Sequence, residues 1–197
     1  MKKNDSLIHY FLKRKSLIKK SLVVSFIFSI LLIAFNSVEK PFIAKLYIEG
    51  IIDSDSEFID ELNKIEGNSN FKGLLVIINS PGGTFVSSKE IYDSLKFLNK
   101  KIPVAIYMKE VATSGAYLVS LGANKIFANT GTITGSVGVI LQTAEITGLL
   151  EKLGITPMII KSGELKAIPN PFEESDSEQI NFIKDVVLEM QKEFLEI

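Results

Sequence analysis

Cysteine is absent from this 197-residue chain, and histidine occurs once, as His9. The lack of cysteine excludes disulfide bonds, thiolate catalysis and cysteine-ligated metals. The chain has no Walker A glycine–lysine pattern, and Gly131, Gly135 and Gly138 do not have the spacing of a dinucleotide-binding turn. The acids between residues 53 and 61 predict a charged, solvated helix start rather than a metal site. No metal, nucleotide or other cofactor is therefore expected.

Basic residues are concentrated at the amino terminus. Residues 1–20 carry seven Lys or Arg and one Asp, a net charge of +6, whereas the remainder of the chain carries −7. The acidic remainder gives no reason to expect nucleic-acid binding.

An uncharged run follows the basic tail, over residues 21–38. As a helix it would extend about 27 Å, close to the hydrocarbon thickness of a bilayer. A buried core helix is one alternative, but the dense basic block before it argues against that interpretation. A cleaved signal peptide is another, but residues 34–37 contain no convincing small-x-small cleavage site. We predict a basic cytoplasmic tail (1–20), a transmembrane signal-anchor (21–38) and a domain (40–197) on the extracytoplasmic, periplasmic side of a bacterial inner membrane.

Apolar periodicity beyond residue 41 predicts strands alternating with helices. We expect strands at 42–48, 73–78, 103–108, 125–128 and 156–160, and helices at 56–65, 86–98, 116–121, 144–153 and 176–197. The continuous apolar run at 73–78 is typical of a parallel strand covered on both faces. The motif Asn79-Ser80-Pro81-Gly82-Gly83 is expected to break that strand sharply. The alternation favours a single α/β domain with a mainly parallel sheet.

Two polar turns follow strands of this predicted sheet. One is the 79–83 motif, and the other contains Thr113 and Ser114. Ligands of such sheets bind beyond the carboxyl ends of the strands, so both turns can face one crevice. Ser114 is either a nucleophile at the start of a helix or an ordinary helix cap.

A serine nucleophile needs a base, and the predicted membrane span separates His9 from Ser114. A lysine can replace histidine if burial lowers its pKa from about 10.4 towards 7. Lys166 has apolar neighbours on both sides, and Lys125 precedes Ile126 and Phe127. Both lysines remain candidates on these grounds, with Lys166 modestly ahead.

Five motifs, in this order, give the chain a specific resemblance. They are Asn79-Ser80-Pro81-Gly82-Gly83, Ala112-Thr113-Ser114-Gly115-Ala116-Tyr117, Ala123-Asn124-Lys125-Ile126, Thr134-Gly135-Ser136-Val137-Gly138-Val139 and Lys161-Ser162-Gly163-Glu164-Leu165-Lys166. Over about residues 42–172 the chain resembles the SppA-type signal peptide peptidases of family S49. These are membrane-anchored serine proteases with a ClpP/crotonase-like spiral of βαβ units and a Ser/Lys dyad.

The resemblance implies a role for each matched residue. Ser114 would be the nucleophile, Lys166 the general base, and Ser136 the hydrogen-bond partner of the lysine, although Ser136 also suits an ordinary turn. Gly83 and Gly115 would donate backbone N–H groups to the oxyanion. The family also implies a homo-oligomer in which the dyad is shared between neighbouring subunits, and peptide substrates such as cleaved signal peptides.

The sequence departs from the family pattern in three places. Ala116 replaces a glycine after the nucleophile, and Ala167 and Pro169-Asn170 replace an acid and a Gly-Ser after the lysine. The family also continues past its long helix, which indicates that residues 40–197 correspond to a fragment or a shortened member. Two alternatives therefore stay open: a non-catalytic protease-like scaffold and a crotonase-like acyl-CoA enzyme.

Overall fold

The computed structural model describes residue 14 and residues 18–30 and 41–197 of the chain. Contacts divide the chain into two units, Met1–Pro41 and Phe42–Ile197. In the first unit, residues 18–30 are helical. Among the described residues, no helix combines the length and apolarity needed to cross a membrane. Much of the predicted tail and residues 31–38 of the predicted span lie outside the described residues, so the membrane anchor remains a prediction.

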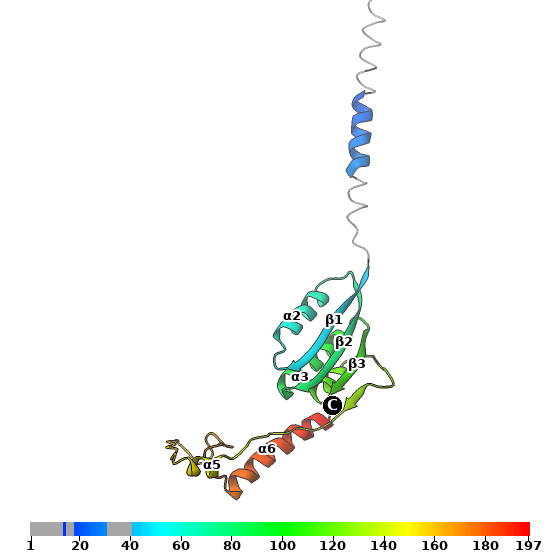
Figure 1. Cartoon of the computed structure of the whole chain (residues 1–197). Coiled ribbons are helices and arrows are strands. Elements are labelled where there is room, and N and C mark those ends of the chain that lie inside the picture. The colour runs from blue at the N-terminus through cyan, green and yellow to red at the C-terminus, as the bar shows by residue number, and fades with distance from the viewer. Residues whose placement is uncertain (1–13, 15–17, 31–40) are drawn as a thin grey trace, which may run out of the picture. The chain divides into compact units, whose positions relative to one another are not determined.

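The second unit is built around a parallel sheet (Figure 1). The strands β1 (Phe42–Ile52), β2 (Phe71–Gly83), β3 (Val104–Thr113) and β4 (Lys125–Ala128) lie side by side in chain order. The short strand β5 (Ile133–Gly135) pairs with the end of β3, beyond the stretch that pairs with β4. Every pairing is parallel, which confirms the predicted sheet and places the carboxyl ends of its strands at one edge.

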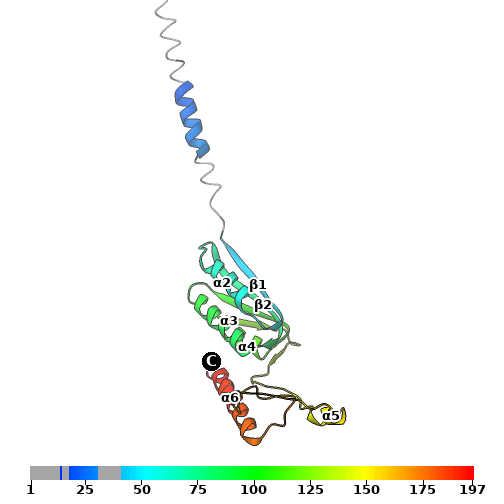
Figure 2. The same cartoon turned by 90° about the vertical axis from the view of Figure 1, so that its left-hand side faces the viewer.

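Helices cover one face of this sheet (Figure 2). They are α2 (Ser56–Glu66), α3 (Phe85–Leu98) and α4 (Gly115–Ser120). Alternate residues of β2 and β3 point into this layer, and Val76, Ile78 and Ile106 are fully buried with Leu95 of α3. Burying one such side chain contributes roughly 1.5–3 kcal/mol, so this layer is the main source of the domain's stability.

The opposite face of the sheet is only partly covered, so the predicted covering of both faces is wrong. The strand register aligns Tyr47, Ile77, Tyr107 and Phe127 in one row across this face. Tyr47 and Phe127, on the outer strands, are 52% and 53% exposed. An apolar run indicates that a strand lies within a sheet, but it does not show that helices of the same chain cover both faces of that sheet.

The strands are longer than their apolar runs predict. The 79–83 motif does not end β2, which continues to Gly83, so the predicted sharp break is wrong. The strand predicted at 103–108 extends to Thr113. In both cases polar and small residues continue the backbone pairing after the apolar pattern stops. These extensions carry both strands to the carboxyl edge of the sheet.

The rest of the unit contains two helices, α5 (Thr147–Lys152) and α6 (Ser177–Leu195). Asp176 caps α6 by accepting a hydrogen bond from Gln179 N–H at 2.8 Å. Near the end of α6, Phe194 packs with Tyr92 and Leu118. The strand predicted at 156–160 is wrong, because this stretch has no strand partner among the described residues.

Candidate active site

Ser114 connects β3 to α4, so the chain passes from strand to helix within one residue. Its φ of 53° and ψ of −123° are unusual for a residue with a Cβ, and such geometry costs about 1–3 kcal/mol. Ser114 N–H donates to Gly135 O at 2.8 Å, and Ser114 O accepts from Leu118 N–H at 3.0 Å. The strained turn is therefore held from one side by β5 and from the other by α4. The predicted position of Ser114, between a strand and a helix, is confirmed.

The end of β2 lies beside this turn and is fixed to it by side chains. The β2–β3 register shifts after Ile78. Within the shifted stretch, Asn79 Oδ1 accepts from Val111 N–H at 3.2 Å. Thr113 Oγ1 donates to Pro81 O at 3.0 Å. These two bonds hold the two polar turns together, as the sequence predicts for the carboxyl edge of a parallel sheet.

Glycines allow the two turns to approach backbone to backbone. Gly82 has φ 98°, and a Cβ at Gly83 would lie 1.9 Å from Ile52 O. A Cβ at Gly115 would lie 2.2 Å from Ser88 Oγ and 3.3 Å from Gly83 N. The backbone of residue 115 and the amide of residue 83 are therefore neighbours, and no side chain can separate them.

Ser114, Gly83 and Gly115 line one pocket of about 340 Å³. The remaining lining residues come from the start of α3, the stretch after β5 and the end of α6, and they are Thr84, Phe85, Val86, Gly138, Val139, Ile140, Met190 and Phe194. Most of these side chains are apolar. Ser114 and the two glycines therefore share a mainly apolar cavity.

Ser136 lies next to this arrangement but does not line the pocket. It follows Gly135, whose carbonyl oxygen binds the Ser114 amide. Its backbone φ is 55°, the second positive value of a serine in this region, and its side chain is exposed. The structure therefore brings Ser136 close to Ser114 along the backbone without showing a contact between the two side chains.

Lys166 is not brought to the pocket by its own chain. It lies in the loop between residues 161 and 176, where its N–H donates to Gly163 O at 3.1 Å. Its side chain is exposed, and its ammonium has no hydrogen-bond or ion-pair partner among the described residues. Of the predicted site residues, Ser114, Gly83 and Gly115 are assembled within one chain, and Lys166 is not.

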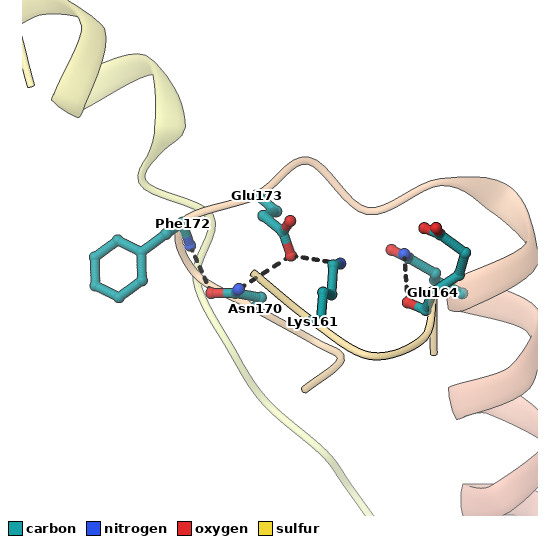
Figure 3. Close-up of polar contacts among 6 residues, drawn as sticks. Lys161, Glu164, Asn170, Phe172 and Glu173 are labelled. Carbon is teal, nitrogen blue, oxygen red and sulfur yellow. Dashed lines mark hydrogen bonds and ion pairs between the residues drawn. The ribbon is translucent and has the colours of Figure 1, made fainter. Parts of the chain in front are cut away.

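A polar network shapes the loop that carries Lys166 (Figure 3). Lys161 Nζ binds Glu173 Oε2 at 2.8 Å, and Asn170 Nδ2 donates to the same oxygen at 3.0 Å. Phe172 N–H donates to Asn170 Oδ1 at 3.1 Å. The hydrogen bond from Lys161, followed by that from Asn170, lowers the pKa of Glu173. The loop is therefore closed at its base by one carboxylate that accepts from two side chains.

The sequence interpretation missed the contribution of α6 to the site. Met190 and Phe194 are nearly 80 residues from Ser114 in the chain, yet both line its pocket. Their apolar spacing predicts a helix with one buried face, but not the element against which that face packs. The interpretation also gave no role to Ser80, which is fully buried and whose Oγ accepts from Gly82 N–H at 3.0 Å. Its place in the 79–83 motif was the available signal.

Comparison with known proteins identifies related sequences. The sequence profile of peptidase family S49 matches residues 96–197, and that of Clp protease matches residues 43–138. A provisionally named signal peptide peptidase SppA of Enterococcus faecium is 36% identical over 169 residues, which are 79% of this chain and 49% of that protein.

Two further relatives give the same result. A provisionally named protease of Synechocystis is 40% identical over 136 residues, or 68% of this chain and 49% of the relative. The chloroplastic serine protease SPPA of Arabidopsis thaliana is 32% identical over 108 residues, or 55% of this chain and 16% of the relative. The chain spans about half the length, or less, of these relatives.

The family profile covers more than half of the chain, including Ser114 and Lys166, and the parallel α/β sheet has the architecture expected of a ClpP/crotonase-like fold. The chain therefore belongs to peptidase family S49.

Proposed function

We propose that the chain is a membrane-anchored serine endopeptidase in which Ser114 is the nucleophile and Lys166 the general base. The observation that carries this proposal is the strained turn at Ser114, which lines a mainly apolar pocket together with Gly83 and Gly115. Strained backbone persists where the surrounding structure holds it, and it is concentrated at active sites. A serine that served only as a helix cap would not need this geometry.

The reaction follows from the groups around the pocket. Ser114 Oγ attacks the carbonyl carbon of the scissile peptide bond and transfers its proton to neutral Lys166 Nζ. The N–H groups of Gly83 and Gly115 donate to the oxyanion, a contribution of about 10²–10³ in rate for each donor. The lysine then protonates the leaving amine, and water hydrolyses the acyl-enzyme. In this scheme Ser136 hydrogen-bonds the lysine and orients it.

We propose that Lys166 reaches the pocket of a neighbouring copy. Its position outside its own chain's pocket supports this arrangement, as do the exposed apolar residues of the same region. Ile140, Met158 and Ile160 are 85%, 87% and 91% exposed. Such residues are normally buried, so a second copy that covers them would also deliver the loop with Lys166. The active enzyme in this proposal is a homo-oligomer.

The apolar lining of the pocket supports apolar peptides, including cleaved signal peptides, as substrates. The membrane anchor at 21–38 would hold the domain where such peptides accumulate after cleavage. With the basic tail in the cytoplasm, the domain acts on the extracytoplasmic side of a single-pass protein.

Mixing two inactive variants tests whether Ser114 is the nucleophile, whether Lys166 is the base, and whether the two residues of one site come from different copies of the chain. Ser114→Ala and Lys166→Ala should each abolish cleavage of an apolar dodecapeptide by the full chain in detergent, whereas Lys152→Ala, a change of another exposed lysine, should not. Equal co-expression of the two inactive variants should restore about a quarter of wild-type activity, because that share of randomly mixed interfaces combines an intact serine with an intact lysine. Full activity of either single variant would remove that residue from the dyad, and no recovery on mixing would place both groups in one chain.

A further inference from the structure

The starts of the strands form a strongly basic edge on the domain. We define the amino edge as residues 42–45, 64–72, 96–103 and 124–125, which contain the starts of β1, β2 and β4 and the turns that lead into β2 and β3. It contains one acid, Glu66, and seven lysines, namely Lys45, Lys64, Lys72, Lys96, Lys100, Lys101 and Lys125. All seven are exposed. The domain is acidic elsewhere, so this concentration of positive charge is local.

These residues form one continuous surface. Phe42 N–H donates to Asn70 O at 3.0 Å, which joins the start of β1 to the turn before β2. Lys101 pairs with Glu66, which joins the turn after α3 to the end of α2. A shallow hollow at this edge is lined from both sides, by residues 65–72 and 98–103. Apart from Lys64 and Lys101, these lysines form no ion pair within 4.0 Å among the described residues.

Apolar side chains are exposed among the lysines. Phe42, Ile43 and Phe97 are 44%, 70% and 49% exposed. Phe42 packs edge-to-face on Phe71 with their centroids 4.4 Å apart, and Lys101 lies 4.5 Å from the centre of the Phe97 ring. Exposed aromatic rings between lysines are typical of surfaces that enter the headgroup layer of a bilayer.

The opposite edge has the opposite charge. Residues 49–57, at the end of β1 and the start of α2, contain four acids and no lysine or arginine. An anionic surface would therefore attract one edge of the sheet and repel the other, so the charge distribution specifies an orientation as well as an attraction.

We infer that the amino edge docks on the headgroups of an anionic bilayer and holds the pocket of Ser114 away from it. This inference rests on the proposed membrane anchor. The predicted span ends at Val38 and β1 begins at Phe42. Four residue steps of about 3.5 Å place Phe42 within about 14 Å of the hydrocarbon core, which is close to the headgroup layer. A connection of this length allows the start of β1, and with it the amino edge, to reach the membrane surface.

A matched pair of reporters can test this docking in the full chain, which contains no tryptophan. Ile43 and Ile51 are both 70% exposed and both lie in β1, about 26 Å apart at 3.3 Å per residue. Ile43→Trp should be quenched by brominated acyl chains when the chain is reconstituted in vesicles of phosphatidylglycerol and phosphatidylcholine. Ile51→Trp should not be quenched. In vesicles of phosphatidylcholine alone, quenching of the first reporter should fall.

Charge variants identify the source of the attraction. Combined Lys72→Gln, Lys100→Gln and Lys125→Gln should lower the ratio of docked to undocked domain about 100-fold, because each lysine near an anionic surface contributes about fivefold. The control replaces three exposed lysines elsewhere, Lys152, Lys184 and Lys192, by glutamine and should leave the quenching unchanged. The inference would be overturned if quenching of Ile43→Trp were the same in neutral and anionic vesicles, or were unchanged by the Lys72, Lys100 and Lys125 substitutions. Loss of oligomerisation in that variant, with quenching unchanged, would assign the edge to a second copy instead.

Flotation separates the failure of this inference from that of the anchor. A chain that floats with neutral vesicles but shows no lysine-dependent quenching keeps its anchor and loses the docking surface. A chain that floats only with anionic vesicles, and only with the three lysines intact, keeps the docking surface and loses the anchor. Absence of flotation with either vesicle rejects both.

Discussion

Replacement of Ser114 by glycine should stabilise the protein while it abolishes activity. Ser114 has φ 53° and ψ −123°, which costs a residue with a Cβ about 1–3 kcal/mol. Glycine adopts this conformation without that cost, but it increases the entropy of the unfolded chain, which offsets about 0.4–1 kcal/mol. The net gain in the free energy of unfolding should be about 1 kcal/mol. Ser114→Ala keeps the Cβ and therefore the strain, so it is the matched control.

The comparison requires an unfolding measurement on both variants. Both should be inactive, and the glycine variant should unfold about 2–4 °C above the alanine variant, the shift that 1 kcal/mol gives for a domain of this size. Circular dichroism at 222 nm follows the loss of α3 and α6 during heating or in urea. A glycine variant that is no more stable than the alanine variant would show that the turn stores no strain. The backbone geometry of Ser114 would then give no support for a catalytic role.

Two further changes test the oxyanion donors and the lysine loop. Gly115→Ala should lower kcat about 10²–10³-fold, because the added Cβ would lie 2.2 Å from Ser88 Oγ and must displace the Gly115 amide. Ser88→Gly in the same chain should recover part of the loss. An unchanged kcat in Gly115→Ala would exclude this donor. Glu173→Gln should increase hydrogen exchange in residues 161–173, with exchange in β2 as the control. The folded pKa of Glu173 is lowered by Lys161, so the pair stabilises the loop fully above pH 4.5 and loses this effect as the pH falls through the lowered pKa. Wild-type exchange, corrected for its intrinsic pH dependence, should approach that of the variant at acid pH, and a pH-independent difference between the two would contradict this role.

The serine half of the site is predictable because its determinants are local. A strand pattern ends at Thr113 and a helix begins at Gly115, so Ser114 is placed at a strand–helix junction by its neighbours alone. The topology of a parallel sheet then brings the 79–83 motif to the same edge. The contact between Gly83 and Gly115 depends on a register shift between β2 and β3, which no periodicity encodes. Only the motif match singled out these two glycines.

The lysine half is not predictable in this way, because its surroundings are not set by local pattern. Lys166 has apolar neighbours in sequence, which suggested a buried amine, yet its side chain is exposed. The environment of a loop residue is set by the elements that pack against the loop. The adjacent residues in the sequence do not predict which elements these are. The polar network at Glu173 fixes the shape of the loop without directing Lys166 towards its own chain's pocket.

The failed strand prediction at 156–160 and the position of Lys166 have a common explanation. An apolar stretch such as Ile155 to Ile160 predicts burial, and the described chain exposes it, with Met158 87% and Ile160 91% accessible. The apolar pattern predicts that the stretch packs against another surface. It does not show whether that surface belongs to the same chain. If a neighbouring copy supplies the partner, the stretch is buried there and Lys166, six residues beyond Ile160, is carried to the same interface. We therefore expect substitution of Met158 and Ile160 by serine to weaken the oligomer and, through loss of the shared lysine, to reduce cleavage in the same proportion.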